Sequence, residues 1–189
     1  ETISFNLKLL IGNIQNSLKE LAVINNNAFT IEIDPTIPDY LLGDPTKLSQ
    51  IFLNLINNAL KFTKNGEVKV ILQCNEINEE FTSIHFKVLD TGIGIPEEKI
   101  ETIFDSFSQG SIEINRKYGG TGLGLTIVKK LIDILGGKIE LESKVGKGSS
   151  FSFDLSFKIG EEKTTVDKSL DFDDSILKDK KVLLIEDNK

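Results

Sequence analysis

Residues 44–62, DPTKLSQIFLNLINNALKF, hold the clearest helix pattern in this chain of 189 residues. Asp44 is a favourable N-cap, and Pro45 fits the first helical turn, where its missing N–H is not needed. The apolar residues recur at helical spacing: Leu48, Ile51, Phe52, Leu55, Ile56, Ala59 and Phe62. The pattern predicts a helix that begins after Asp44 and packs one face against a core.

A polar stripe borders the apolar face of this predicted helix. At 100° per residue, Asn54, Asn58 and Lys61 fall within about 60° of one another. Such a stripe could form the wall of a pocket, or it could be an ordinary solvated helix face. Asparagine is a poor helix former, yet residues 54–58 contain three of them, which keeps the functional interpretation open.

Helix and strand patterns alternate on both sides of this segment. Helical spacing occurs in residues 7–21 and 124–135, and strand-like alternation in residues 29–33, 68–74, 84–90, 139–141 and 151–157. Mixed helices and late, hairpin-like strands predict an α+β fold. We expect a two-layer sandwich, with helices on one face of a mixed β-sheet.

The strand that ends at Asp90 runs into a glycine-containing turn, DTGIGIP, at residues 90–96. Gly92 and Gly94 allow the backbone to approach a ligand closely. The Asp90 carboxylate can only accept hydrogen bonds when ionised, so it could bind an amino group such as that of adenine. The alternative is a plain strand-to-loop turn without a ligand.

A second glycine-rich stretch, GGTGLGL at residues 119–125, leads directly into a predicted helix. Backbone N–H groups in such a loop, together with the electropositive helix N-terminus, suit phosphate oxygens. The stretch is not a GxxxxGK[ST] loop. No strand directly precedes it, which disfavours a Rossmann dinucleotide site.

These segments, in this order, resemble the catalytic ATP-binding domain of sensor histidine kinases, within the wider group that contains DNA gyrase and MutL. NLINNALKFT at residues 54–63 resembles the N box of that family, and DTGIGIP its G1 box. FDSFSQ at residues 104–109 resembles the F box, and GGTGLGL the G2 box. The resemblance extends over residues 5–157 and implies a Bergerat ATP-binding fold.

The resemblance also implies roles for individual residues. Asp90 would bind the adenine amino group, Asn58 would hold Mg²⁺ with support from Asn54, and Lys61 would neutralise phosphate charge. Residues 105–119 would form a mobile lid over ATP. The remaining nucleotide contacts would come from Gly92, Gly94, Ile95, Arg116, Tyr118, Gly120, Thr121, Gly122, Leu123 and Gly124.

One position separates a kinase from a hydrolase. The gyrase and MutL branch carries a Glu general base where this chain has Asn54, and an amide cannot act as a base at neutral pH. With Asn54, Asn58 and Lys61 as the catalytic set, the sequence favours transfer of the γ-phosphate to a histidine of a dimerisation domain. The alternatives are an ATPase of the same group and a regulatory nucleotide-binding module.

The single histidine, His85, lies between inward-facing Ile84 and Phe86, and it is expected on the opposite sheet face as an ordinary polar residue. The family's phosphoacceptor histidine lies on a helix, so we expect it in a separate domain. Cys74 continues the inward alternation of its strand and is expected to be a small buried residue.

Composition places limits on partners and location. The net charge of −7 argues against nucleic-acid binding, and no apolar run is long enough to cross a bilayer. A single cysteine agrees with a reducing, cytoplasmic location, although the parent protein could be anchored through upstream segments.

The end of the chain suggests further domains. After a catalytic domain at residues 1–157, residues 158–178 lose periodicity and are expected to be a linker. Residues 179–189, with Glu186 and Asp187 after an apolar run, resemble the start of a receiver domain.

Overall fold

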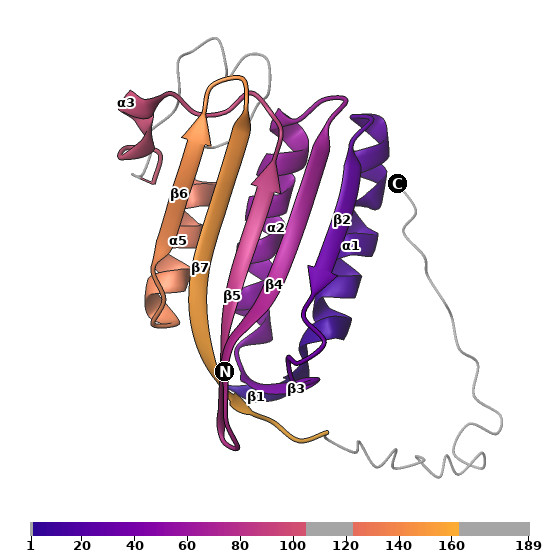
Figure 1. Ribbon diagram of the computed structural model, residues 1–189, viewed down its shortest axis with the longest axis vertical. Coiled ribbons are helices and arrows are strands. Elements are labelled where there is room, and N and C mark those ends of the chain that lie inside the picture. Colours follow the sequence, from indigo (N-terminus) through magenta and orange to yellow (C-terminus); the bar gives the residue numbers. More distant parts are fainter. Residues whose placement is uncertain (1, 105–122, 163–189) are drawn as a thin grey trace, which may run out of the picture.

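The computed structural model describes residues 2–104 and 123–162. The elements, labelled as in Figure 1, are β1 Ile3–Asn6, α1 Leu7–Ile24, β2 Ala28–Ile33, β3 Tyr40–Gly43, α2 Pro45–Phe62, β4 Glu67–Ile77, β5 Phe81–Asp90, α3 Glu97–Ile100, α5 Gly124–Ile134, β6 Ile139–Lys144 and β7 Gly148–Ile159. No helix in these two ranges has the length and apolar character that a membrane span requires.

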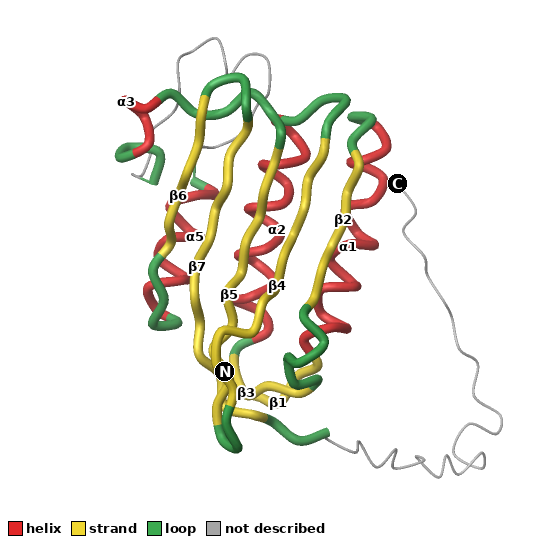
Figure 2. The backbone as a smooth tube through the Cα atoms, viewed as in Figure 1, coloured by secondary structure: helices red, strands yellow, loops and turns green. Residues whose placement is uncertain are grey.

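One mixed sheet carries the fold. Its strand order is β1-β3-β7-β5-β4-β2, and β6 adds to β7. β2 pairs with β4 in parallel, whereas the other described pairs are antiparallel. Figures 1 and 2 show α1, α2 and α5 side by side behind the sheet. The structure therefore confirms the expected two-layer α+β sandwich.

Helix α2 lies at the centre of the helical layer, in contact with both α1 and α5. It begins as expected: the Asp44 carboxylate accepts a hydrogen bond from the Lys47 N–H at 3.0 Å. Its apolar face is buried against the sheet, where the Phe52 ring lies 5.6 Å from the Phe86 ring and 6.2 Å from the Phe153 ring. Burial of this face leaves the Asn54 side of the helix at the edge of the core.

Two short strands were missed by the sequence analysis. From the sequence, no element was assigned to the residues before Leu7, but β1 is a strand that pairs with β3. Both strands have four residues, too few to show an alternation pattern. At the other end, β7 extends past the expected domain boundary at residue 157, because Lys158 and Ile159 still pair with β3. The rest of the expected linker beyond residue 162, and the receiver-like segment, lie outside the described residues.

Asn25 and Asn27, at the turn between α1 and β2, secure the C-terminal end of α2. Asn27 Nδ2 donates to the carbonyl oxygens of Leu60 and Thr63, at 3.2 and 2.9 Å. Asn27 Oδ1 accepts from the Gly66 N–H at 3.1 Å. The last carbonyls of a helix have no partner within the helix, so this side chain supplies what the backbone lacks.

Asn27→Ala should therefore destabilise the domain. Three hydrogen bonds at about 1 kcal/mol each, less what water restores, correspond to about 2 kcal/mol of the free energy of unfolding. Asn16→Ala on the exposed side of α1 is the matched control, and it should have little effect or stabilise the helix slightly. Urea denaturation of the three proteins measures the difference. Equal stability of the two variants would contradict this role of Asn27.

Candidate nucleotide-binding site

Two asparagines of α2 meet the start of α5. A Cβ atom placed on Gly124 would lie 3.3 Å from Asn54 Oδ1 and 3.9 Å from Asn58 Nδ2. Asn54 Nδ2 donates to the Gln50 carbonyl oxygen at 3.0 Å, which turns its oxygen toward Gly124. Both side chains are half-buried, whereas the neighbouring Asn57 is exposed. The predicted stripe is therefore the wall of a junction between two helices.

Lys61 lies two turns further along α2 than Asn54. Its Nζ is 5.1 Å from the centroid of the Phe62 ring. Burial lowers the pKa of the Lys61 ammonium group, because removal from water disfavours the charged form. An anion beside Lys61 would raise the pKa again and favour the charged ammonium form.

Asp90 is the last residue of β5 and is half-buried. Burial raises the pKa of its carboxyl group, and hydrogen bonds from the Gly92 N–H and from the N–H and hydroxyl of Ser149 oppose that rise. The Gly92 N–H donates to Asp90 Oδ1 at 2.8 Å. The Gly92 N–H therefore fixes the orientation of one carboxylate oxygen.

The turn after Asp90 packs against backbone on two sides, which explains its glycines. A Cβ on Gly92 would lie 2.5 Å from the Phe62 carbonyl oxygen, and the Ile93 N–H donates to that same oxygen at 3.2 Å. Gly94 has φ +70°, and a Cβ there would lie 2.1 Å from the Lys144 carbonyl oxygen. The turn is thereby held between the end of α2 and the β6–β7 hairpin.

The β6–β7 hairpin contributes residues that the sequence analysis had treated only as a turn. Ser143 Oγ accepts a hydrogen bond from the Ile95 N–H at 2.8 Å, and Ser149 lies directly opposite Asp90 in the β5–β7 ladder. Gly148, with φ +106°, brings the hairpin against the backbone of Asp90. In the sequence these residues were visible only as a Gly-Ser pair, Gly148 and Ser149, at the start of a strand. The residues that the hairpin contacts lie 48 or more positions earlier in the chain.

The predicted residues thus form two groups on the same helix. Asp90 and Gly92 lie at the Phe62 end of α2, whereas Gly124 lies against Asn54, eight residues earlier. At 1.5 Å per residue these ends are separated by about 12 Å along the helix. A bound nucleotide could place its base at one end and its phosphates at the other.

Part of the expected site lies outside the described residues. Arg116, Tyr118, Gly120, Thr121 and Gly122, together with the lid, cannot be placed. Leu123, the residue before α5, is half-buried.

The first stretch of described residues ends at Phe104, the first residue of the F box and the residue just before the predicted lid. Phe104 packs edge-on against Phe151 with a centroid distance of 6.4 Å, and Lys129 Nζ lies 5.9 Å from the Phe104 ring. These contacts attach the beginning of the F box to β7 and α5.

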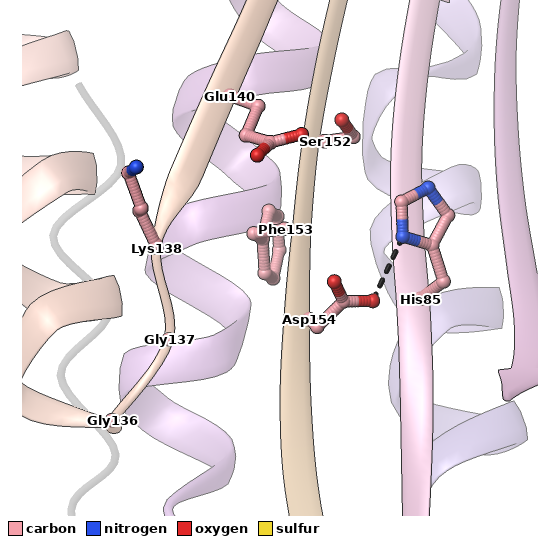
Figure 3. Close-up of a pocket in the computed structure, with 8 residues that line it drawn as sticks. All are labelled: His85, Gly136, Gly137, Lys138, Glu140, Ser152, Phe153 and Asp154. Atoms are coloured by element: carbon pink, nitrogen blue, oxygen red, sulfur yellow. Dashed lines mark hydrogen bonds and ion pairs between the residues drawn. The ribbon is translucent and has the colours of Figure 1, made fainter. Parts of the chain in front are cut away.

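His85 lies on the sheet face away from the helices, as expected. Its Nδ1 is 2.8 Å from Asp154 Oδ1, which also accepts from Asn75 Nδ2 at 2.9 Å. Figure 3 shows the pair beside a shallow hollow of about 260 Å³, lined also by Lys138 and Glu140. This hollow lies on the opposite side of the sheet from α2, so His85 is no part of the candidate site.

Cys74, which was expected to be a small buried residue, is only partly buried.

No group of three or more His, Cys, Asp or Glu side chains gathers within residues 2–104 and 123–162. The junction of α2 and α5 instead presents Asn54 Oδ1 and Asn58 Nδ2 toward Gly124.

The chain belongs to the family of histidine kinase-, DNA gyrase B- and HSP90-like ATPases, whose profile matches residues 43–159. The sensor histidine kinase AruS of Pseudomonas aeruginosa is 41% identical over 155 residues, covering 82% of this chain and 16% of the relative. The signal transduction histidine-protein kinase BarA of Escherichia coli is 36% identical over 156 residues, covering 82% and 17%. The chain therefore spans less than a fifth of the length of these two relatives.

Solved structures agree with this assignment. Full-length ShkA in complex with AMPPNP superposes with a TM-score of 0.71 at 27% identity, over 85% of this chain and 32% of that one. The nucleotide-free catalytic domain of the histidine kinase ThkA superposes with a TM-score of 0.67 at 31% identity, over 82% and 95%. The expectation of a histidine kinase catalytic domain, with its α+β fold, is confirmed.

Proposed function

We propose that this chain binds Mg-ATP and donates the γ-phosphate to a histidine of a separate dimerisation domain, as part of a two-component phosphorelay. One observation carries the proposal: a half-buried carboxylate oriented by the Gly92 N–H lies near the Phe62 end of α2, and a pair of half-buried amides lies further back along the same helix, against Gly124. Family membership and the histidine kinases among the relatives support it.

The carboxylate end suits adenine. Asp90 would accept a hydrogen bond from the exocyclic amino group, while Gly92 and Gly94 let the turn beside it pack against the Phe62 and Lys144 carbonyl oxygens. Guanine presents a carbonyl oxygen at the corresponding position, and a carboxylate would repel it. This end of the site would therefore select the base.

The amide end suits phosphates. The first N–H groups of α5, an eleven-residue helix, have no carbonyl partner within the helix and carry partial positive charge. Lys61 lies two turns beyond Asn54, nearer the Asp90 end, so its long side chain would extend back along α2 to add a full positive charge beside the phosphates. Phosphoryl transfer depends on such positioning and charge neutralisation more than on covalent help from the protein.

The same junction fits magnesium. Mg²⁺ binds oxygen ligands and keeps several of its waters, so it needs few protein ligands. Asn58 would supply one oxygen after a half-turn of its amide, since its nitrogen now faces Gly124, and Asn54 already presents its oxygen there. Bound at this place, the ion would neutralise charge on the phosphates.

The residues present favour transfer over hydrolysis. Asn54 cannot take a proton from water, and its nitrogen is engaged by the Gln50 carbonyl. His85 is held by Asp154 on the far face of the sheet, away from the proposed phosphate end. The acceptor histidine would therefore come from a dimerisation domain of the parent protein. We propose further that residues 163–178 link the catalytic domain to a receiver domain that begins near residue 179.

Transfer of label from radiolabelled ATP tests the proposal. The chain alone should stay unlabelled, and a dimerisation domain with its phosphoacceptor histidine should acquire acid-labile label when added. Asn58→Ala should weaken Mg-ATP binding by calorimetry about tenfold, roughly 1.4 kcal/mol, and slow transfer. Asn57→Ala, an exposed asparagine of the same helix, is the control and should change neither.

Two results would contradict the proposal. Phosphate release by the chain alone at the rate of transfer would indicate an ATPase. Acid-labile label on the chain alone that disappears in His85→Ala would show that the acceptor lies within it.

A further inference from the structure

We propose that Ser143, on β6, is a positioning residue for adenine recognition. It would complete a hydrogen-bonded chain that runs from the Ile95 N–H through the Ser143 and Ser149 hydroxyls to the Asp90 carboxylate. The inference rests on the proposed function, because it assigns to Ser143 the orientation of the group that would bind the base.

The contacts of Ser143 are all short and come from two segments of the chain. The Ile95 N–H donates to Ser143 Oγ at 2.8 Å. Ser143 Oγ lies 3.0 Å from Ser149 Oγ and 3.0 Å from the Gly148 carbonyl oxygen. Ser149, which is buried, lies directly opposite Asp90 in the β5–β7 ladder and directly opposite Ser143 in the β6–β7 ladder. Hydrogen bonds from its N–H and hydroxyl lower the pKa of the Asp90 carboxyl group, against the rise that burial causes. Ser143 therefore reaches Asp90 through Ser149.

Counting protons gives the chain a direction. A hydroxyl has one proton, so when Ser149 donates to Asp90 its oxygen is left as an acceptor. Ser143 is the hydroxyl 3.0 Å away that can donate to it, while Ser143 Oγ accepts from Ile95. The other choice for the Ser143 proton is the Gly148 carbonyl, and it would leave the Ser149 oxygen without this donor.

This direction matters for the base. Hydrogen bonds arranged head to tail strengthen one another in a buried site, and donation to Asp90 favours its ionised form. An ionised carboxylate with one oxygen oriented by Gly92 and Ser149 is set to accept a proton from an amino group. Ser143 also ties the Ile95 backbone to the same hairpin, so the base-binding turn and its carboxylate share one support.

Affinities for ADP and IDP test the idea, because hypoxanthine has a carbonyl where adenine has an amino group. In Ser143→Ala the ADP affinity measured by calorimetry should fall about fivefold, and the IDP affinity should change little. Ser143→Thr, which keeps the hydroxyl, should restore the preference for ADP. Equal losses for both nucleotides would show a merely structural role and overturn the inference.

A double-mutant cycle examines the path through Ser149. If Ser143 acts only through that hydroxyl, Ser143→Ala should have no further effect on ADP affinity in a Ser149→Ala background. Independent, additive losses would overturn the inference. An unchanged ratio of ADP affinity to IDP affinity in Ser143→Ala would overturn it while leaving the Asp90 assignment intact. No preference in the unmodified chain would overturn both.

Discussion

Gly148→Ala should destabilise the domain by about 4 kcal/mol and abolish nucleotide binding, although it adds a single methyl group. Gly148 has φ +106°, a conformation that side chains strongly disfavour. A Cβ at this position would lie 1.9 Å from the Asp90 carbonyl oxygen and 2.8 Å from Thr91 Cα. Both atoms belong to backbone, so no side chain can rotate away. Relief requires that β5 and β7 separate at the residue that would bind adenine.

Gly146→Ala, in the same hairpin turn, is the matched control. Gly146 also has a positive φ, +73°, but a Cβ there would meet no heavy atom within 4 Å. The control therefore carries the conformational strain without the collision and should lose only about 1 kcal/mol. Denaturation curves and calorimetry with ADP measure both variants. Similar stability and ADP affinity in the two proteins would show that the hairpin does not support Asp90.

Asp90→Asn should lower the affinity for ATP and ADP about ten- to a hundredfold and weaken the preference for adenine over guanine. A hydrogen bond to a charged group contributes about 1.5–3 kcal/mol, and the asparagine amide offers a weaker acceptor at the same place. The folded state should not suffer. Burial raises the pKa of the Asp90 carboxyl group, which means that the charge costs stability at neutral pH.

Because the pKa of Asp90 is raised, the Asp90→Asn variant should also differ from the unmodified protein in how stability and binding depend on pH. Because the folded-state pKa lies above the ordinary value, the native protein binds more protons than the unfolded chain between the two values. In that window the Asp90 contribution to stability falls as pH rises. Binding of adenine nucleotides should have the opposite trend and weaken as pH falls through the folded pKa. Asp90→Asn should remove the Asp90 contribution to the pH dependence of stability and to the pH dependence of nucleotide binding.

Calorimetry at several pH values and thermal unfolding of the free protein measure these effects. Asp133→Asn, an exposed carboxylate on α5, is the control and should leave nucleotide affinity unchanged. An Asp90→Asn protein with unchanged ATP affinity and unchanged preference for ATP over GTP would refute the assignment of Asp90 to the base.

The sequence by itself determined the elements whose signals are local. The bounds of α2 follow from an N-cap, a proline and a continuous apolar stripe, and the structure begins the helix where they predict. The amide stripe of Asn54 and Asn58 and the carboxylate of Asp90 were readable for the same reason, because helical and strand periodicity assigns side chains to faces. The resemblance to histidine kinases then related these residues to one site.

Only the tertiary structure decided how the site is supported. β1 and β3 are four residues each and exist because they pair with each other and with the end of β7. The hydrogen bond between Ser143 and Ile95 spans 48 residues, and the collision that Gly148 avoids is with a strand 58 positions earlier in the chain. Local propensity carries no information about such partners, since strand register and the approach of two turns are set by packing of the whole sheet.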